Sequence, residues 1–235
     1  MIPDYIPKHI IFSSRNKIDS TIINLKHTVQ FANWIDRMEG DAKYVKSIPY
    51  KFDLIYRASR DGNTVAAFHE KCNNEGATMV VAKIKGSEQL AGGYNPLGWS
   101  SNKLWKHTFE SFIFSMKNRR NLQTSNVGYC KNNKYSLGCD PQTGPNFYDL
   151  RCQDTKIWNY ENHHCYPKID LPSSFYVDDY EVFTVTTKPI SNMRSISETN
   201  QISQTSNDEA CSSISEKFNL RSITGKFHIK KNSLF

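Results

Sequence analysis

The middle of the chain consists of short apolar or alternating runs that are separated by glycine and polar residues. In the run at residues 50–59, Phe52, Leu54 and Tyr56 lie on one face and residues such as Lys51 on the other. Alternation with a period of two is typical of a half-buried β-strand. Similar runs predict strands at residues 77–86, 89–99, 111–118 and 174–187, and shorter ones near 126–131, 134–139 and 146–152. The pattern therefore predicts a mainly β fold.

Two segments have helical spacing and should flank the strands. Residues 26–37 follow Asp19-Ser20, which has the composition of a helix N-cap. The apolar face of this helix, which should pack on the domain, contains His27, Phe31, Trp34 and Ile35. A second helix is expected at residues 64–72, capped by Asn63 or Thr64. Its buried face would contain Val65, Phe68 and Cys72, and Asn73, Asn74 and Gly76 would end it.

Glycines mark the turns and one crowded strand. Gly62 follows Asp61 and can adopt the positive φ that a turn there requires. Gly86 begins a hairpin turn. The pair Gly92-Gly93 lies inside a strand, which indicates a bulge or a close neighbouring backbone. No GxGxxG pattern surrounds this pair, so it does not predict a phosphate-binding loop.

The composition divides the chain into three parts. Residues 1–19 contain Pro3 and Pro7 and should form an N-terminal arm. Residues 20–188 contain the predicted helices and strands and should form the domain. Residues 189–235 are rich in Ser and Asn, and most of this segment cannot bury enough apolar surface to offset its ordering entropy. We expect a disordered tail there, in which residues 218–231 could form a small strand or docking segment.

The net charge, the hydrophobicity and the cysteine spacing exclude several classes of protein. The 235 residues carry a formal charge of +7 without a long run of like charges, which favours a solvated basic surface over a nucleic-acid site. No stretch is long and apolar enough to span a membrane, and Pro3 and Asp4 do not fit a signal peptide. We therefore expect an intracellular, cytoplasmic protein with six reduced cysteines. None of the six forms a CxxC pair.

Several motifs occur together in an order that resembles a known family. They are LIYRASRDG, FHEKC, MVVAKIKG, LAGGYNP, SFIFSMKN and YVDDYEVF. From about Ser20 to Thr187 the chain resembles the TLDc domain, especially the copies in fungal BTB–TLDc proteins. The sequence has no counterpart of the BTB region. It also departs from the family at residues 144–150, where Pro145 and Asn146 interrupt a strand that often contains three glycines.

The resemblance implies a fold and a set of motif positions. The fold would be a two-sheet antiparallel β-sandwich with short flanking helices (an α+β arrangement). The motif positions, structural or partner-facing, would be Ser59, Arg60, Asp61, Gly62, Gly92, Gly93, Tyr94, Phe114 and Glu181. Of these, Arg60-Asp61-Gly62 would form the turn before the first core helix, and Glu181 would lie in the closing strand.

Three groups of residues could carry chemistry, and each has a simpler structural interpretation. His69 and Cys72 could form a base–nucleophile pair, or Cys72 could pack in the core and His69 lie partly exposed. His163, His164 and Cys165, with Cys152 upstream, could bind a metal, but neighbouring strand residues face opposite ways. Ser59-Arg60-Asp61 could place an acid beside an arginine or simply form a turn. We therefore assign no catalytic residue, cofactor or metal.

The resemblance and the missing catalytic set favour a protein-interaction domain. TLDc domains are linked to oxidative-stress protection and to regulation of the vacuolar-type proton pump, so the resemblance implies a protein partner such as a subunit of that pump. An alternative is a cysteine-dependent enzyme of oxidative defence that uses Cys72, Cys139 or Cys165. A third possibility is an adaptor whose Ser-rich tail is phosphorylated. No nucleic-acid partner is expected, and the oligomeric state is open.

Overall fold

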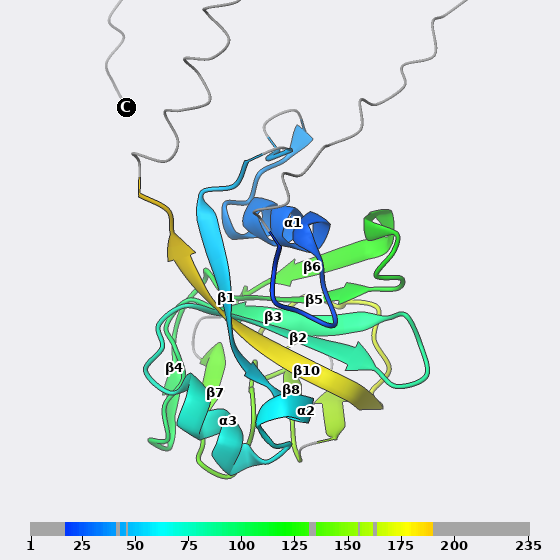
Figure 1. The fold of residues 1–235 in the computed structure, drawn as a ribbon. Helices are drawn as coiled ribbons and strands as arrows, with labels where there is room; N and C mark the ends of the chain where they lie inside the picture. The colour runs from blue at the N-terminus through cyan, green and yellow to red at the C-terminus, as the bar shows by residue number, and fades with distance from the viewer. Residues whose placement is uncertain are drawn as a thin grey trace, which may run out of the picture. The chain divides into compact units, whose positions relative to one another are not determined.

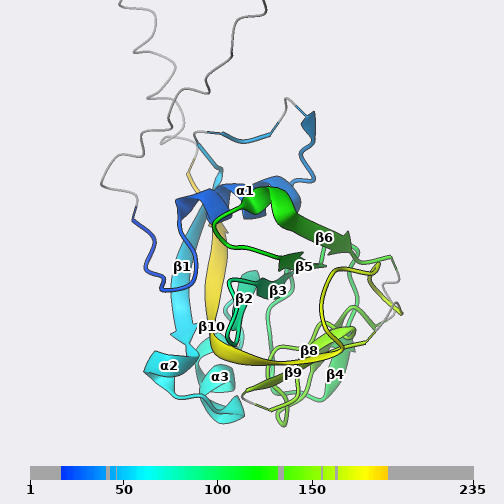
Figure 2. The same ribbon diagram turned by 90° about the vertical axis from the view of Figure 1, so that its right-hand side faces the viewer.

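The longest strand, β10, joins the two halves of the fold. The computed structural model describes residues 17–40, 43–45, 47–131, 135–154, 156–161 and 164–189. Strand β10 (Ser174–Thr187) pairs antiparallel with β2 (Thr78–Ile84), with β1 (Tyr50–Arg57) and with β9 (Ile157–Tyr160). The pairing of β10 with β2 has a register shift between Val177 and Asp179. Figure 2 shows that β10 bends from β2 toward β8 and β9.

The remaining strands extend this sheet on both sides of β10. They are β3 (Leu90–Asn95), β5 (Phe112–Met116), β6 (Ser125–Tyr129) and β8 (Leu150–Cys152). Eight strands form an antiparallel, half-barrel-like sheet in the order β6-β5-β3-β2-β10-β9-β8, with β1 also on β10 (Figure 1). Strands β4 (Leu104–Lys106) and β7 (Leu137–Cys139) form a separate small sheet.

The mainly β class and the antiparallel pairing are therefore confirmed, but the two-sheet sandwich is only partly right. The described strands form one large curled sheet and a two-stranded one instead of two comparable sheets. The physical reason is the length of β10: its 14 residues are enough to pair with β9 at one end and with β1 and β2 at the other.

The central strands of the sheet are buried on both sides, and a hydrophobic core lies on each face. In β2, Met79 and Val81 belong to one cluster, and Val80 and Ala82 belong to the other. The first cluster, the α1 core, is completed by Phe31, Trp34, Phe112, Phe114 and Phe183. The second cluster, the α3 core, is completed by Phe68, Trp99, Phe147, Trp158 and Tyr180.

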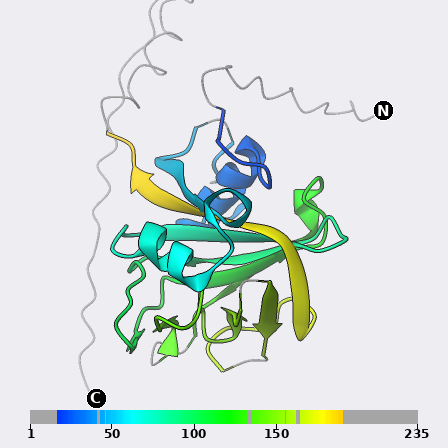
Figure 3. The same cartoon turned by 60° about the horizontal axis from the view of Figure 1, so that its bottom comes forward.

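Helices cover the two cores from different sides. Helix α1 (Leu25–Ile35) contributes to the α1 core and coincides closely with the predicted residues 26–37. Its N-cap is Asn24, whose side chain accepts a hydrogen bond from the Lys26 backbone, so the predicted cap at Asp19-Ser20 is wrong. Helices α2 (Ala58–Asp61) and α3 (Val65–Cys72) come toward the viewer in Figure 3. Thr64 caps α3, as predicted.

A bulge in β1 changes the predicted facing of one residue. Phe52 and Leu54 pack in the α1 core, but the register shifts between Leu54 and Tyr56. Tyr56 is consequently turned into the α3 core, although simple alternation placed it with Phe52 and Leu54. The bulge is the reason that Tyr56 packs in the α3 core and not beside Phe52 and Leu54.

Some predictions concern residues that the structure does not describe. Most of the N-terminal arm, nearly all of the 189–235 tail and the segment 218–231 lie outside the described residues, so these predictions stay untested. A short 3-10 helix, η2 (Leu122–Thr124), precedes β6. None of the helices in the described ranges has the length and hydrophobicity of a membrane span.

Candidate functional site

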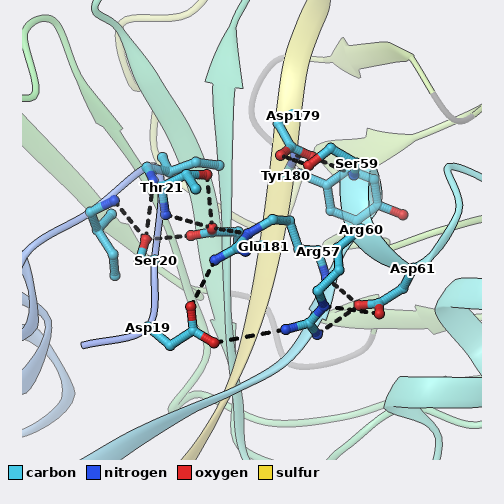
Figure 4. Close-up of polar contacts among 12 residues, drawn as sticks. Asp19, Ser20, Thr21, Arg57, Ser59, Arg60, Asp61, Asp179, Tyr180 and Glu181 are labelled. Carbon is cyan, nitrogen blue, oxygen red and sulfur yellow. Dashed lines mark hydrogen bonds and ion pairs between the residues drawn. The ribbon is translucent and has the colours of Figure 1, made fainter. Parts of the chain in front are cut away.

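Glu181 is a fully buried carboxylate in the middle of β10 (Figure 4). Its Oε2 accepts a hydrogen bond from Ser20 Oγ at 2.5 Å. Its Oε1 accepts from the Thr21 backbone N at 2.9 Å and from Thr21 Oγ1 at 3.1 Å. Arg57 Nε lies 2.7 Å from the same oxygen. A buried charge is tolerated when it is paired and hydrogen-bonded, and both conditions hold here.

Arg57 joins this carboxylate to the segment that precedes α1. Only 12% of its side chain is exposed, and its Nη2 reaches Asp19 Oδ1 at 3.1 Å. Burial opposes the charge on Arg57, but the hydrogen bonds with Glu181 and Asp19 outweigh it and raise the pKa of the guanidinium. We call Asp19, Ser20, Thr21, Arg57 and Glu181 the Glu181 network. It ties residues 19–21 to β1 and β10.

The motif Ser59-Arg60-Asp61 forms helix α2 beside this network. Asp61 Oδ2 accepts from the Arg57 backbone N at 2.8 Å, and both carboxylate oxygens accept from Arg60. The Arg60 guanidinium holds the pKa of Asp61 below its usual value. Ser59 donates to Asp179 from its backbone N and its hydroxyl. The contacts of Asp61 are local, whereas those of Ser59 join α2 to β10. Gly62 ends α2 with a φ of 101°.

The glycine motif makes room for one aromatic ring on each face of the sheet. A Cβ on Gly92 would lie 2.9 Å from Phe114 Cε1, and a Cβ on Gly93 would lie 2.7 Å from Phe147 Cε1. Tyr94 follows in the α1 core and stacks on Phe112 at 5.4 Å. Gly92, Gly93, Tyr94 and Phe114 are therefore packing residues. The sequence signal, two adjacent glycines in an apolar strand, indicated this close approach.

The structure does not bring His69 and Cys72 together as a catalytic pair. The His69 ring contacts Asn73 Oδ1 at 2.9 Å through Nδ1, and the backbone carbonyls of Asp140 and Thr143 at 3.0 Å through Nε2. Cys72 is fully buried in the α3 core, and burial raises the pKa of its thiol strongly. The histidine therefore positions the 140–143 loop against α3.

The predicted metal group is also divided among structural contacts. Cys152 Sγ donates to the Asp154 carbonyl, and Cys165 Sγ donates to the Tyr135 carbonyl at 3.4 Å. His163 lies outside the described residues. Asp149 is buried and accepts from the backbone N–H groups of His164, Cys165 and Tyr166. Across the described ranges, no three His, Cys, Asp or Glu side chains gather as metal ligands.

A comparison with protein families decides the identity of this domain. The model of the TLDc domain matches residues 16–186. The chain belongs to the TLDc family. A comparison with curated proteins finds no match.

Sequence reasoning missed most of the Glu181 network of this TLDc domain. The sequence marks Glu181 as a motif position, but it predicts a helix cap at Ser20 and indicates no role for Arg57. One signal was available: Glu181 lies in an apolar stretch of β10 whose neighbours are buried on both sides. A charge in such a stretch requires a buried cation or several donors. The sequence could not name those partners, because Ser20 lies 161 positions away.

The TLDc domain also exposes apolar side chains around β4. They are Leu97, Leu104, Trp105 and Phe109, with exposed fractions from 39% to 52%. Lys106 Nζ donates to the carbonyls of Leu97 and Gly98, which fixes β4 against that loop. Trp105 packs on Tyr135 and Tyr148, so its ring is held although it is partly exposed. We call the four exposed residues the β4 surface.

Proposed function

We propose that this TLDc domain is a non-catalytic protein-interaction domain that binds its partner through the β4 surface. The observation that carries the proposal is the exposure of four large apolar side chains on residues 97–109. Exposed apolar residues are common singly, whereas four of them within residues 97–109 concentrate apolar surface on one segment, and contiguous apolar patches mark interaction sites. Trp105 is already held by two rings, so little side-chain entropy is lost when a partner covers it.

The charges around this surface favour one kind of partner. Lys103 and Lys106 flank the exposed residues on β4, and the acidic residue next to this segment in the sequence is Glu110, which follows Phe109. The Lys103 side chain is 82% exposed and forms a long ion pair with Asp140, with 3.8 Å between Nζ and Oδ2. The best fit is a protein surface with an apolar centre and an acidic rim, because complementary charge fixes orientation and speeds association.

Family membership guides the choice of partner. We propose that the partner is a cytoplasmic subunit of the vacuolar-type proton pump, and that regulation of this pump underlies a role in oxidative-stress protection. The proposed interacting unit is residues 20–188, with 1–19 as an arm and 189–235 as a tail. An intracellular, cytoplasmic location belongs to the same proposal.

The alternative, a cysteine-dependent enzyme, receives no support from the geometry. Cys72, Cys130, Cys139, Cys152 and Cys165 are all buried. Burial raises the pKa of Cys152 to about 12 and that of Cys165 to about 11. A catalytic cysteine needs an accessible thiolate near neutral pH, which these environments oppose.

The proposal is tested by affinity capture from a cell extract with the full chain as bait. The variant Leu104→Ser/Phe109→Ser removes two exposed apolar groups, and Tyr176→Ser removes an exposed ring from β10 as a matched control. We expect pump subunits with the wild type and the control, and at least a tenfold loss with the double variant. Absence of pump subunits from a folded wild-type bait, or equal recovery with the double variant, would overturn the proposal.

A further inference from the structure

A basic pocket lies where the chain enters α1, away from the β4 surface in sequence. It is formed by the segment before α1, the first turn of α1, and the loop between β5 and η2. The lining residues are Thr21, Ile22, Ile23, Asn24, Lys26, His27, Arg119, Arg120 and Leu122. Its volume is about 400 Å³, which is within the range of small-ligand sites.

The lining carries three positive side chains and no carboxylate. Lys26, Arg119 and Arg120 line the pocket. The two arginines share a single carboxylate outside the lining: Arg119 Nε lies 2.7 Å from Glu88 Oε2, and Arg120 Nε lies 3.5 Å from the same atom. Each guanidinium has five N–H donors, so this carboxylate occupies only part of them. Lys26 takes part in none of the ion pairs found in the described part of the chain.

A buried histidine adds a further donor at the same place. His27 is 2% exposed and lines the pocket. Its Nδ1 lies 3.0 Å from Asn24 Oδ1 and 3.1 Å from the Asn24 backbone N, whose N–H it accepts when the ring proton is on Nε2. Nε2 is buried and makes no hydrogen bond of ordinary geometry, although the Arg119 backbone lies near enough to favour the protonated ring. The positive end of the α1 dipole lies at the same site.

We propose that this pocket binds a phosphate group, carried either by a small soluble molecule or by a lipid headgroup. Lys26 and the two arginines would contact the phosphate oxygens, and the His27 Nε2–H would lie beneath them. Three cations suit a doubly charged tetrahedral anion better than a single carboxylate, which one arginine could satisfy alone. The lining contains no Phe, Tyr or Trp on which a nucleic-acid base could stack.

The pocket is preorganised by the Glu181 network. Thr21 lines the pocket, and its backbone N and hydroxyl are both held by Glu181. The Arg119 guanidinium lies 3.5 Å from the Thr21 carbonyl. The wall that residue 21 contributes is therefore fixed before a ligand arrives, which lowers the entropy lost on binding.

The test uses two probes that separate the sources of phosphate. Inositol trisphosphate is titrated calorimetrically into the full chain, and vesicles with 5% phosphatidylinositol phosphate are compared with vesicles of phosphatidylserine at equal charge. The site variant is Lys26→Glu/Arg120→Glu. The control, Lys71→Glu/Lys156→Glu, makes the same change of net charge at exposed residues outside the lining.

We expect binding of the soluble probe, of the phosphoinositide vesicles, or of both, and at least a tenfold weaker affinity for the site variant. The control variant should stay within twofold of the wild type, and both variants should keep the wild-type melting temperature. The proposal fails if a folded wild type binds neither probe. It also fails if the control loses as much affinity as the site variant, because binding would then follow net charge alone.

Discussion

At the scale of single residues, the stability of the fold depends on hydrogen bonds and ion pairs that offset the desolvation of a few buried polar groups. Glu181 has no exposed surface, yet it accepts three hydrogen bonds in addition to its ion pair with Arg57. These donors replace the water that burial removes. The same carboxylate holds residues 20 and 21 against β10, so one side chain supports both the interior and the entrance to α1.

The variant Glu181→Gln tests this compensation. It keeps the shape of the side chain but leaves Arg57, which is 12% exposed, with only Asp19 as a charged partner. We expect a loss of about 3 kcal/mol in the free energy of unfolding, measured in urea. Asp53→Asn is the control, because it breaks an exposed ion pair with Lys51 and should cost less than about 1 kcal/mol. Equal losses in the two variants would contradict the assigned role.

His27 predicts a pH dependence of stability. Desolvation by burial lowers its pKa from 6.5 to about 4. As the pH falls, His27 therefore binds its proton in the unfolded chain before it does so in the folded chain. The contribution of neutral His27 to the free energy of unfolding is complete above pH 6.5 and is lost as the pH falls toward 4. The full effect is about 3 kcal/mol. Urea unfolding at several pH values should show a steeper loss for the wild type than for His27→Gln. Parallel pH profiles would refute the assignment.

At the scale of elements, the longer periodic segments could be predicted from the sequence. Helix α1 and strands β2 and β10 were placed correctly because each is long and mainly apolar on its buried side. The sequence does not predict the three-residue strand β4 or the four-residue β9, although it predicts strands at the equally short β7 and β8, because segments this short show too little periodicity for a dependable prediction. The bulge that turns Tyr56 to the other core depends on the pairing with β10, which the local sequence does not encode.

Of the candidate site, the sequence identified Glu181 and the glycine pair but not their partners. The glycines could be interpreted locally because a missing side chain implies a close neighbour. Ser20, Thr21 and Arg57 could not be assigned to Glu181, because this contact joins the beginning of the domain to its last strand. The β4 surface was also missed, since exposure at residues 97–109 depends on which strands cover the sheet.

The glycine pair gives a prediction at this scale. A Cβ at Gly93 would lie 2.7 Å from both the Phe112 carbonyl oxygen and the Phe147 ring. Because the carbonyl belongs to the adjacent strand, Gly93→Ala should force β3 and β5 apart and cost about 2–3 kcal/mol. Gly86→Asn is the control at an open turn position with a φ of 70°, and should cost less than about 1 kcal/mol. Thermal and urea unfolding would distinguish the two; an unchanged stability for Gly93→Ala would contradict the packing argument.

At the scale of the whole described unit, most aromatic side chains and thiols are buried in the two cores, and a few apolar side chains are exposed around β4. The sheet has an apolar cluster on each face, and these clusters take up most of the aromatic residues and four of the five described thiols. The exposed apolar side chains around β4 are outside both clusters. In the described residues, apolar side chains around β4 are therefore exposed while the five thiols are buried.

Burial of the thiols predicts slow chemistry with thiol reagents. In the variant Cys211→Ser, only the five described cysteines remain, and all five are buried. Their labelling at pH 7.5 should be about a hundredfold slower in the native protein than in urea, because it requires local unfolding. A cysteine that reacts at the unfolded rate in the native protein would revive the enzymatic alternative.

The most direct test of the account is the affinity of the purified chain for the purified cytoplasmic sector of the vacuolar-type proton pump. Biolayer interferometry with wild type, Leu104→Ser/Phe109→Ser and Tyr176→Ser separates partner identity from the surface used. The account predicts saturable binding by the wild type and Tyr176→Ser, and at least a tenfold weaker affinity for the double variant. No binding by the folded wild type would contradict the partner, and full binding by the double variant would contradict the β4 surface.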